Sequence, residues 1–407
     1  VLPDPPPLSM RLTVTAAGYQ TLDLNLTDLV HTLRLSLQAH PIFASEIEVT
    51  GLRADVGETP VTVTNVDREE IERLYWAQDV PLFLSPTPGF YAYNDSGNGI
   101  GYSYFFLRSF DMRRTAVSLN GVPLNDAHSH GLFFIDLADF LSTAEDVQVQ
   151  RGVGTTLYGG SAIGGSIDLR TRQPLPERRL RVEALGGAYG TSRFTLEWDS
   201  GLIDERWGAT FRYSRVQSDG YRDQSWAEMW NYYASVVHYG EKTTTRINLF
   251  GGPEKTHLAY EGVPKVYLEG EVTGDQRVDR RSNPLEYPGE IDEFFQPHYQ
   301  LIHSWQIRDE LVLQNTFFYF TGDGYFQQFK DDRWFPEYGL EPFPGPHGEI
   351  IDTTDLVRRR EVDVWDGGWI PNLQWSHNGG RGSLQVGAAI RLHSGRHFGT
   401  VGWAQYY

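Results

Sequence analysis

The chain has 407 residues, enough for two or three domains, and a formal net charge of −18. This charge argues against a nucleic-acid partner, because neutralising phosphates requires clustered Lys and Arg. Cysteine is absent, which excludes disulfide frameworks and thiolate metal sites. No apolar stretch approaches the roughly 18 residues of a membrane-spanning helix, so a helical membrane protein is not expected.

The first segments predict a small β-module. Residues 10–38 alternate apolar and polar positions around the turn-like "AAGYQT", as in the last strands of a β-sandwich. The opening "VLPDPPPLSM" reads as a loop from a longer polypeptide rather than a leader. A short extended run, "EIEVTG" at residues 46–51, follows.

Residues 61–173 have a mixed pattern that predicts an α+β unit. The first part reads as a strand, a helix capped by Asn65 or Asp67, and a Pro-rich loop. "TAVSLNGVPLND" predicts a hairpin around Asn120-Gly121, because this dipeptide favours the tight turn between antiparallel strands. "DLADFLSTAEDVQVQRG" predicts a short helix followed by a strand.

From residue 178 onward, long segments alternate with period 2, and nine strands are predicted between residues 178 and 393. Every second connection is short, whereas the third, fifth and seventh are long, at about 217–227, 252–296 and 322–367. Tight turns at one rim and long loops at the other are typical of an outer-membrane β-barrel. Segments of about 9–11 residues also match a tilted membrane-spanning strand. The alternative is a soluble all-β domain.

The two faces of these strands differ. Phe194, Leu196 and Trp198 alternate with charged and hydroxyl side chains, so one face is expected to touch lipid and the other to line a wet lumen. Nine strands cannot close such a barrel, because single-chain bacterial barrels have an even number of strands. We therefore expect the full protein to extend beyond both ends of this sequence.

A glycine-dense stretch, "RGVGTTLYGGSAIGGSIDLRT" at residues 151–171, precedes the strands. It lacks the Gly-Lys-Ser/Thr of a phosphate-binding P-loop and the Gly-x-Ser-x-Gly of a nucleophile elbow. Leu157 stands where a dinucleotide fingerprint needs its third glycine. Catalytic interpretations of this stretch therefore fail, and no other motif predicts an enzyme.

Several segments carry a family resemblance. "VQVQRGVGTTLYGGSAIGGSIDLRTRQP" resembles the end of the plug domain of TonB-dependent outer-membrane receptors, and "FFLRSFDMRRTAVSLNGVPLNDAHSHG" resembles its central strands. "EIEVTG" resembles the junction that carries the TonB box. Residues 10–38 are similar to the end of a carboxypeptidase-regulatory-like module, and "HYQLIHSW" and "GDGYFQQFKDD" resemble stretches of siderophore receptors.

The resemblance implies a mainly β fold, in which an incomplete transmembrane antiparallel β-barrel is occluded by an N-terminal α+β plug domain and preceded by part of a small β-sandwich. The implied domains are the end of the regulatory-like module, the linker with the TonB-box-like segment, the plug and the first part of the barrel, at residues 1–42, 43–60, 61–174 and 175–407.

Structural roles are expected for the glycines and two arginines of the plug. Glycine allows close approach to neighbouring backbone, here the barrel wall, and the expected positions are Gly152, Gly154, Gly159, Gly160, Gly164 and Gly165. Arg108 and Arg151 either pair with carboxylates on the inner wall or are plain surface arginines.

The TonB-box candidate is Glu46, Ile47, Glu48, Val49 and Thr50. Such an extended segment adds a strand to a partner's sheet edge. The alternative is an ordinary linker strand.

Two plug loops, residues 87–104 and 125–134, are expected to meet a ligand on the external side. The candidates are Tyr91, Tyr93, Asn94, Tyr102, His128 and His130. Aromatic and amide groups suit a large polar ligand with flat rings. Two histidines alone make a poor metal site, so loop hydrogen bonding or a structural role is favoured for His128 and His130, and no metal site is predicted. The two longest wall loops are expected to be mainly solvated, with some residues closing over the ligand.

The resemblance implies TonB-dependent import of a ferric siderophore across the outer membrane of a Gram-negative-type bacterium, with TonB and outer-membrane lipid as partners and a surface lipoprotein as a further candidate partner. No cofactor, catalytic residue or nucleic-acid partner is expected. The same machine carrying cobalamin, haem, an oligosaccharide or a peptide remains open, as does a surface binding or adhesion barrel without transport.

Overall fold

The computed structural model describes residues 53–54, 61–153, 162–376 and 382–406 in full, and the backbone of residues 10–14, 22–26 and 377. Strands β1 (Met10–Val14) and β2 (Leu22–Leu26) pair antiparallel. The rest of the expected regulatory-like module and the TonB-box candidate Glu46–Thr50 lie outside the described residues.

A five-stranded sheet forms the centre of the plug. Its strands, in spatial order, are β3 (Thr62–Val66), β9 (Ala144–Arg151), β10 (Gly165–Thr171), β7 (Thr115–Leu119) and β8 (Val122–Pro123). β7 and β8 form the expected hairpin, and both turn residues, Asn120 and Gly121, have the positive φ angles that an Asn-Gly turn requires.

The edge strand β3 pairs with β9, and the chain just before it is fastened to β9 as well. The side-chain amide of Gln148 accepts a hydrogen bond from the Ala54 backbone N–H at 2.8 Å and donates one to the Ala54 carbonyl at 3.0 Å. Arg53 forms an ion pair with Asp146. Two side chains of β9 thus hold the segment that leads into the plug.

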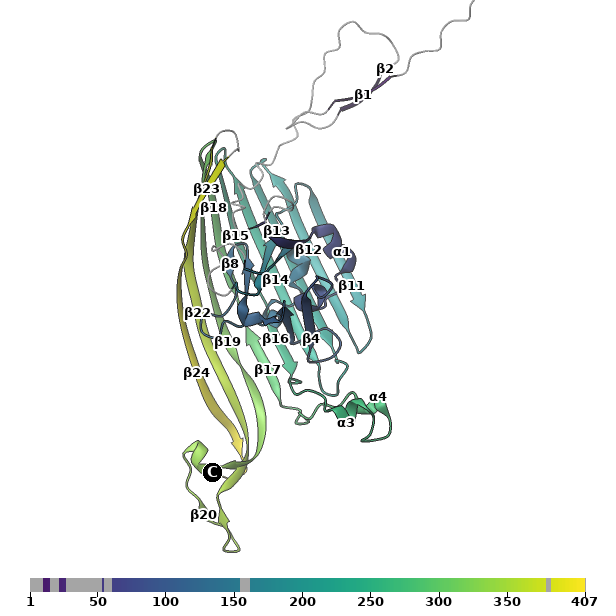
Figure 1. The fold of residues 1–407 in the computed structure, drawn as a ribbon, viewed down its shortest axis with the longest axis vertical. Coiled ribbons are helices and arrows are strands. Elements are labelled where there is room, and N and C mark those ends of the chain that lie inside the picture. The colour runs from purple at the N-terminus through teal and green to yellow at the C-terminus, as the bar shows by residue number, and fades with distance from the viewer. Residues whose placement is uncertain are drawn as a thin grey trace, which may run out of the picture.

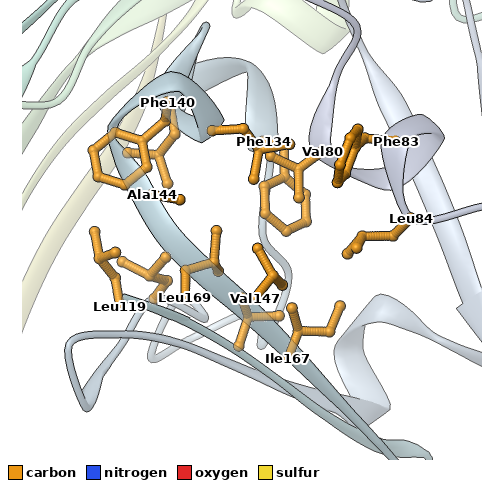
Figure 2. Close-up of a cluster of buried hydrophobic side chains, with 14 of the residues drawn as sticks. Val80, Phe83, Leu84, Leu119, Phe134, Phe140, Ala144, Val147, Ile167 and Leu169 are labelled. Atoms are coloured by element: carbon orange, nitrogen blue, oxygen red, sulfur yellow. The ribbon is translucent and has the colours of Figure 1, made fainter. Parts of the chain in front are cut away.

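Short helical segments cover the plug sheet. Helix α1 (Arg68–Leu74) begins at Asp67, whose carboxylate accepts a hydrogen bond from the Glu70 N–H, and α2 (Val80–Phe83) follows. The helix predicted around residues 135–143 is instead two 3₁₀ turns, Phe134–Leu137 and Phe140–Thr143. Figure 2 shows Val147, Ile167 and Leu169 of the sheet packed against the aromatic and aliphatic side chains of these segments.

A second, three-stranded plug sheet consists of β4 (Phe90–Asn94), β5 (Ser103–Leu107) and β6 (Phe110–Asp111). Phe90 and Phe105 stack at 5.2 Å and belong to the core, so this hairpin is anchored through one of its faces.

A curved antiparallel wall surrounds the plug on one side (Figure 1). Its main strands are β11 (Arg178–Gly186), β12 (Ser192–Ile203), β13 (Trp207–Ser218), β14 (Ala227–Tyr239), β15 (Thr243–Gly251), β18 (His298–Arg308), β19 (Leu311–Trp334), β22 (Thr353–His377), β23 (Gly382–Gly387) and β24 (Ile390–Ala404). With β23 and β24 counted as one interrupted strand, the described part of the wall has the nine main strands that the sequence predicts.

The wall is apolar on its outer face and polar on its inner face. Leu384, Val386 and Ile390 are 55%, 57% and 53% exposed, whereas Arg193, Glu197 and other polar side chains of the inner face are buried against the plug. This is the reverse of a soluble sheet packed on a dry core. The expected fold class, a plug within a β-barrel wall, is confirmed.

Two exposed tryptophans mark the height of the apolar band. Trp365 and Trp375 lie ten residues apart on the outer face of β22. Ten residues at about 3.4 Å each, tilted by about 40°, span roughly 26 Å along the membrane normal, which matches the height of a barrel's apolar band. Among the described residues, no helix is long and apolar enough to cross a membrane.

The prediction of a long loop at residues 322–367 is wrong. β19 and β22 stay paired from Leu311↔Trp375 out to Trp334↔Thr353, and the connection is only residues 335–352, with the short strands β20 (Phe343–Pro344) and β21 (Ile350–Ile351). Beyond the apolar band both faces of a strand meet polar surroundings, so apolar alternation no longer marks it.

The expected loop at residues 252–296 is also partly strand. β16 (Pro253–His257) continues the line of β15 and pairs with β14, and β17 (Ile291–Phe295) precedes β18 and pairs with β16 and β19. The remainder holds two short helices, α3 (Lys265–Leu268) and α4 (Gln276–Asp279). Two residues expected on solvated loop surface, Glu254 and Phe335, are buried.

Candidate ligand-binding face and plug–wall contacts

Exposed aromatic rings cover one face of the β4–β5 hairpin. Tyr91 is 63% exposed and Tyr93 is 42% exposed. Tyr93 stacks on Tyr104 at 5.1 Å between ring centroids, and Tyr91 lies 6.2 Å from Phe106. Strand alternation produces this arrangement, because the intervening residues point into the plug core. The hairpin offers an aromatic platform to which the flat parts of a ligand can bind.

The tip of this hairpin lies against the rim with the long loops. Asn98 donates a hydrogen bond to Ser218 at 2.6 Å, and the Tyr221 N–H donates to the Ser96 carbonyl at 3.0 Å. Arg222 donates to the carbonyl oxygens of Asp95, Ala259, Glu261 and Ser282. The β13–β14 connection and the β16–β17 loop are therefore fixed to the plug beside the platform.

Asn94 supports this loop from within. Its amide Nδ2 donates to the Tyr102 carbonyl and to Ser103 Oγ, both at 3.0 Å, and its Oδ1 accepts from the Gly99 N–H at 3.1 Å. Ser103 also donates to the carboxyl group of Asp79, and burial raises the pKa of Asp79 to about 8. The hydrogen-bonding groups of the Asn94 side chain are therefore occupied by contacts within the loop.

Tyr102 links the plug to the wall. Its hydroxyl donates a hydrogen bond to the Asp292 carboxylate of β17, and its ring packs edge-on against Phe133 at 5.7 Å. The structure therefore places this candidate ligand residue in a plug–wall contact.

His128 and His130 are both exposed and lie on the loop after β8. Asp126 Oδ1 accepts a hydrogen bond from the His128 N–H at 3.1 Å, and Asn125 donates to the His130 carbonyl at 3.1 Å. His130 has a φ of 59°, so its backbone shapes the turn. The ring of His128 lies 6.0 Å from that of His397 on β24.

Two buried ion clusters join the plug to β12 and β13. Asp139, between the two 3₁₀ turns, forms ion pairs with Arg212 and with Arg193 and accepts a hydrogen bond from Ser214. Burial alone would raise the pKa of Asp139, but Arg212 and Arg193 hold it below its usual value.

The second cluster centres on Arg172, between β10 and β11. Its guanidinium binds both carboxylate oxygens of Asp199, at 3.0 and 3.1 Å, and lies 3.1 Å from Glu197. It also donates to Thr210 at 2.8 Å. A bidentate pair of this kind fixes orientation as well as charge, so the end of the plug is anchored where the wall begins.

Contacts with the wall were expected for the plug glycines and Arg151, but Gly152, Gly164, Gly165 and Arg151 make their contacts within the plug. Arg151 donates to the Pro88 carbonyl at 3.2 Å and to the Val63 carbonyl at 3.5 Å, and Arg108 is exposed. A Cβ at Gly164 would lie 2.6 Å from Phe110, one at Gly165 would lie 2.3 Å from the Gln150 carbonyl oxygen, and one at Gly152 would lie 2.7 Å from Arg108. Gly154, Gly159 and Gly160 lie outside the described residues.

Comparison with known protein families identifies the plug. Residues 55–166 match the family model described as the TonB-dependent receptor plug domain. The match of the plug, the relatives and the shared fold support a TonB-dependent receptor with a plug and a β-barrel wall. Members of this family are outer-membrane plug-and-barrel proteins of Gram-negative bacteria, and the relatives described next are receptors and transporters, not enzymes.

The receptor is 27% identical over 282 residues to the ferrioxamine B receptor of Salmonella typhimurium, an alignment that covers 64% of this chain and 37% of that protein. It is 31% identical over 180 residues to the vitamin B12 transporter BtuB of Vibrio vulnificus, covering 43% and 28%. The crystal structure of the ferric-catecholate import receptor Fiu from Escherichia coli K12 shares the fold with a TM-score of 0.62 at 18% identity, covering 85% of this chain and 48% of that chain. The chain thus spans less than half the length of each of these three proteins.

Sequence reasoning missed an acidic cluster between the receptor's plug and wall. Asp136 of the plug faces Glu254 of β16 and Asp292 of β17. Glu254 is 1% exposed, and its carboxyl group lies near those of Asp292 and Asp136 and near the side chain of Thr256. The composition of the predicted loop did not indicate this buried cluster, because an acidic residue in a loop is normally expected to be solvated.

The Asp136→Asn substitution is expected to stabilise the receptor at pH 7. Burial, followed by repulsion from Asp292, raises the pKa of Asp136 well above its usual value. At pH 3.5 the carboxyl group is protonated in the folded state and mainly protonated in the unfolded state, where its pKa is about 3.9. As the pH rises, the unfolded state ionises first and the folded state is disfavoured.

Thermal unfolding of both proteins at pH 3.5 and pH 7 checks this prediction. The Asn variant should be more stable by about 1 kcal/mol at pH 7 and equal to the wild type at pH 3.5. A variant that is less stable at pH 7 would contradict the assignment.

Proposed function

We propose that the receptor imports a ferric siderophore across the outer membrane of a Gram-negative-type bacterium, driven by TonB. The observation that carries the proposal is the aromatic platform of Tyr91, Tyr93, Tyr104 and Phe106, held by a plug that occupies the concave face of the wall beside the long loops. A plug in this position blocks passive flow, so passage requires energy. The similarity to a ferrioxamine B receptor supports the choice of ligand.

TonB is the proposed source of that energy, through the segment Glu46–Thr50. Deleting residues 46–51 from the full-length protein should abolish uptake of a ⁵⁵Fe-labelled siderophore while leaving its binding to whole cells intact, because the platform and loops are unchanged. Deleting residues 3–8, a segment of equal length, should leave both intact. Normal uptake after the 46–51 deletion would assign this segment to an ordinary linker.

Tyr93 provides a test of the platform itself. Tyr93→Ala should weaken siderophore binding by about 1 kcal/mol, roughly fivefold, because it removes the ring that stacks with Tyr104. Tyr93→Phe keeps the ring and should bind within about twofold of the wild type. Fluorescence quenching on the purified receptor measures both, and equal affinities in all three proteins would exclude the platform.

Cobalamin is the second candidate, because the receptor is 31% identical over its matching region to a vitamin B12 transporter. Growth of a strain without the receptor, compared under iron limitation and under cobalamin limitation, separates the two ligands. A surface adhesion barrel would show neither defect and would not depend on residues 46–51. A surface lipoprotein partner is proposed only for an oligosaccharide or peptide ligand.

A further inference from the structure

Two arginines of β22 lie on the inner face of the wall, beyond the plug. Val364 and Asp366 of β22 are buried on that face, and β22 keeps an unbroken register with β19 from there to Arg358. Because side chains alternate along a strand, Arg358 and Arg360 share the face of these two buried residues. They lie toward the rim with the long loops, where β22 extends past the plug (Figure 1).

The contacts of the two guanidinium groups are with neutral side chains. Arg358 donates hydrogen bonds to the Tyr338 hydroxyl at 3.3 Å and to Gln328 Oε1 at 3.2 Å. Arg360 lies over the ring of Phe326, 5.7 Å from its centroid. Within the described ranges neither arginine forms an ion pair, whereas the wall arginines that contact the plug do. Both positive charges are therefore available to a bound anion.

Charge is segregated between the two faces of these strands. The carboxylates of Asp323, Glu361 and Asp363 lie on the outer face, at positions that alternate with the two arginines and share the face of the exposed Trp365. Arg359 lies on that outer face as well. A chain with a net charge of −18 thus places positive charge on the inner face at this level. Such a surface raises the local concentration of an anionic ligand.

Space for a ligand lies beside the arginines. Gly399 of β24 is in register with Arg360, and among the described residues a Cβ at Gly399 would have only the Arg359 carbonyl oxygen nearby, at 3.6 Å. On the β19 side, Gln328 donates a hydrogen bond to the Tyr260 hydroxyl at 2.8 Å, which brings a residue of the β16–β17 loop to the same face. Guanidinium groups surrounded by hydroxyl and amide groups suit a planar, oxygen-rich anion.

We propose that Arg358 and Arg360 bind the anionic oxygens of a negatively charged ferric chelate, such as a ferric tris-catecholate. The inference rests on the proposed import of a ferric siderophore and specifies the charge of that ligand. Three catecholates leave a ferric ion with a net negative charge, whereas three hydroxamates leave it neutral. The Cα atoms of the two arginines lie roughly 7 Å apart on one strand face, so both side chains can reach one chelate.

The test uses the full-length receptor purified in detergent and two probes with the same tripodal backbone, a ferric tris-catecholate and a ferric trihydroxamate. Fluorescence quenching should show that the wild type binds the tris-catecholate more tightly by roughly tenfold. The double variant Arg358→Gln/Arg360→Gln should lose roughly tenfold in affinity for this anion and keep its affinity for the neutral complex within about twofold. Arg359→Gln removes a charge from the outer face between them and is the matched control, with both affinities within about twofold of the wild type.

Two further measurements separate charge from fold. Arg358→Lys/Arg360→Lys keeps the charges and should recover part of the lost affinity. Raising NaCl from about 50 mM to about 500 mM should weaken binding of the tris-catecholate by the wild type and have little effect on the Gln double variant.

Three results would overturn the anion site while leaving import in place: equal affinity of the wild type for the two complexes, unchanged affinity of the Gln double variant for the anion, or an equal loss of both affinities in that variant. Binding of neither complex by the wild type would overturn the proposed function together with the anion site.

Discussion

Replacing Asp139 by Asn is expected to lower the free energy of unfolding of the plug by about 3–5 kcal/mol, because it leaves buried charge without a partner. Asp139 is the counter-charge of Arg212, which is fully buried. Among the described residues, Nε and Nη1 of Arg212 have no hydrogen-bond partner, so nothing else replaces the lost carboxylate. Urea-induced unfolding, followed by the protection of the plug from trypsin, measures the change.

The matched control for this variant is Glu269→Gln, which breaks the exposed Lys265–Glu269 pair at 3.2 Å. It should change the stability by less than about 0.5 kcal/mol, as is usual for surface pairs. The effect of Asp139→Asn should shrink when the pH falls through the lowered pKa of Asp139, because the wild-type carboxylate is then protonated too. A loss comparable to that of the control at pH 7 would show that the cluster does not hold the plug.

Gly165→Ala is expected to destabilise the plug by about 3 kcal/mol or more, through overpacking and backbone strain combined. Gly165 has a φ of 153°, and an added Cβ would lie 2.3 Å from the Gln150 carbonyl oxygen and 2.5 Å from Leu107 Cδ2. The backbone contact cannot be relieved by a rotamer change, because Gln150 is paired with its neighbours in the central strand β9.

Gly186→Ala is the control for this second variant, because no heavy atom lies within 4 Å of the added Cβ. It should leave the stability within about 0.5 kcal/mol of the wild type. Calorimetric unfolding of both variants checks the pair of predictions, and equal transition temperatures would show that the glycine-dense stretch tolerates side chains.

The sequence predicted the elements whose signals are local. The Asn120-Gly121 turn, the cap at Asp67 and the alternation in β11–β13 each depend on residues adjacent in the chain. Within the apolar band, lipid and water impose opposite preferences on alternate side chains, and period 2 follows directly. The apolar band therefore defines the part of the wall that periodicity can find.

Contacts between distant segments could not be predicted in this way. The partner of Asp139 is Arg212, 73 residues away, and the partner of Tyr102 is Asp292, 190 residues away. Nothing in either local sequence distinguishes these side chains from solvated ones. The arginines expected to reach the wall were Arg108 and Arg151, whereas Arg172 does so, because the first wall strand begins only six residues beyond it.

The fastening of residues 53 and 54 to β9 has a mechanical consequence. A load applied to the chain ahead of them reaches the Arg53–Asp146 pair and the Ala54–Gln148 hydrogen bonds first, and then β3, whose five residue pairs lie at the sheet edge. Arg172 secures the opposite end of the plug to the wall. Traction would therefore act on the edge strand β3 before it reaches the inner strands β9 and β10, which are paired on both sides.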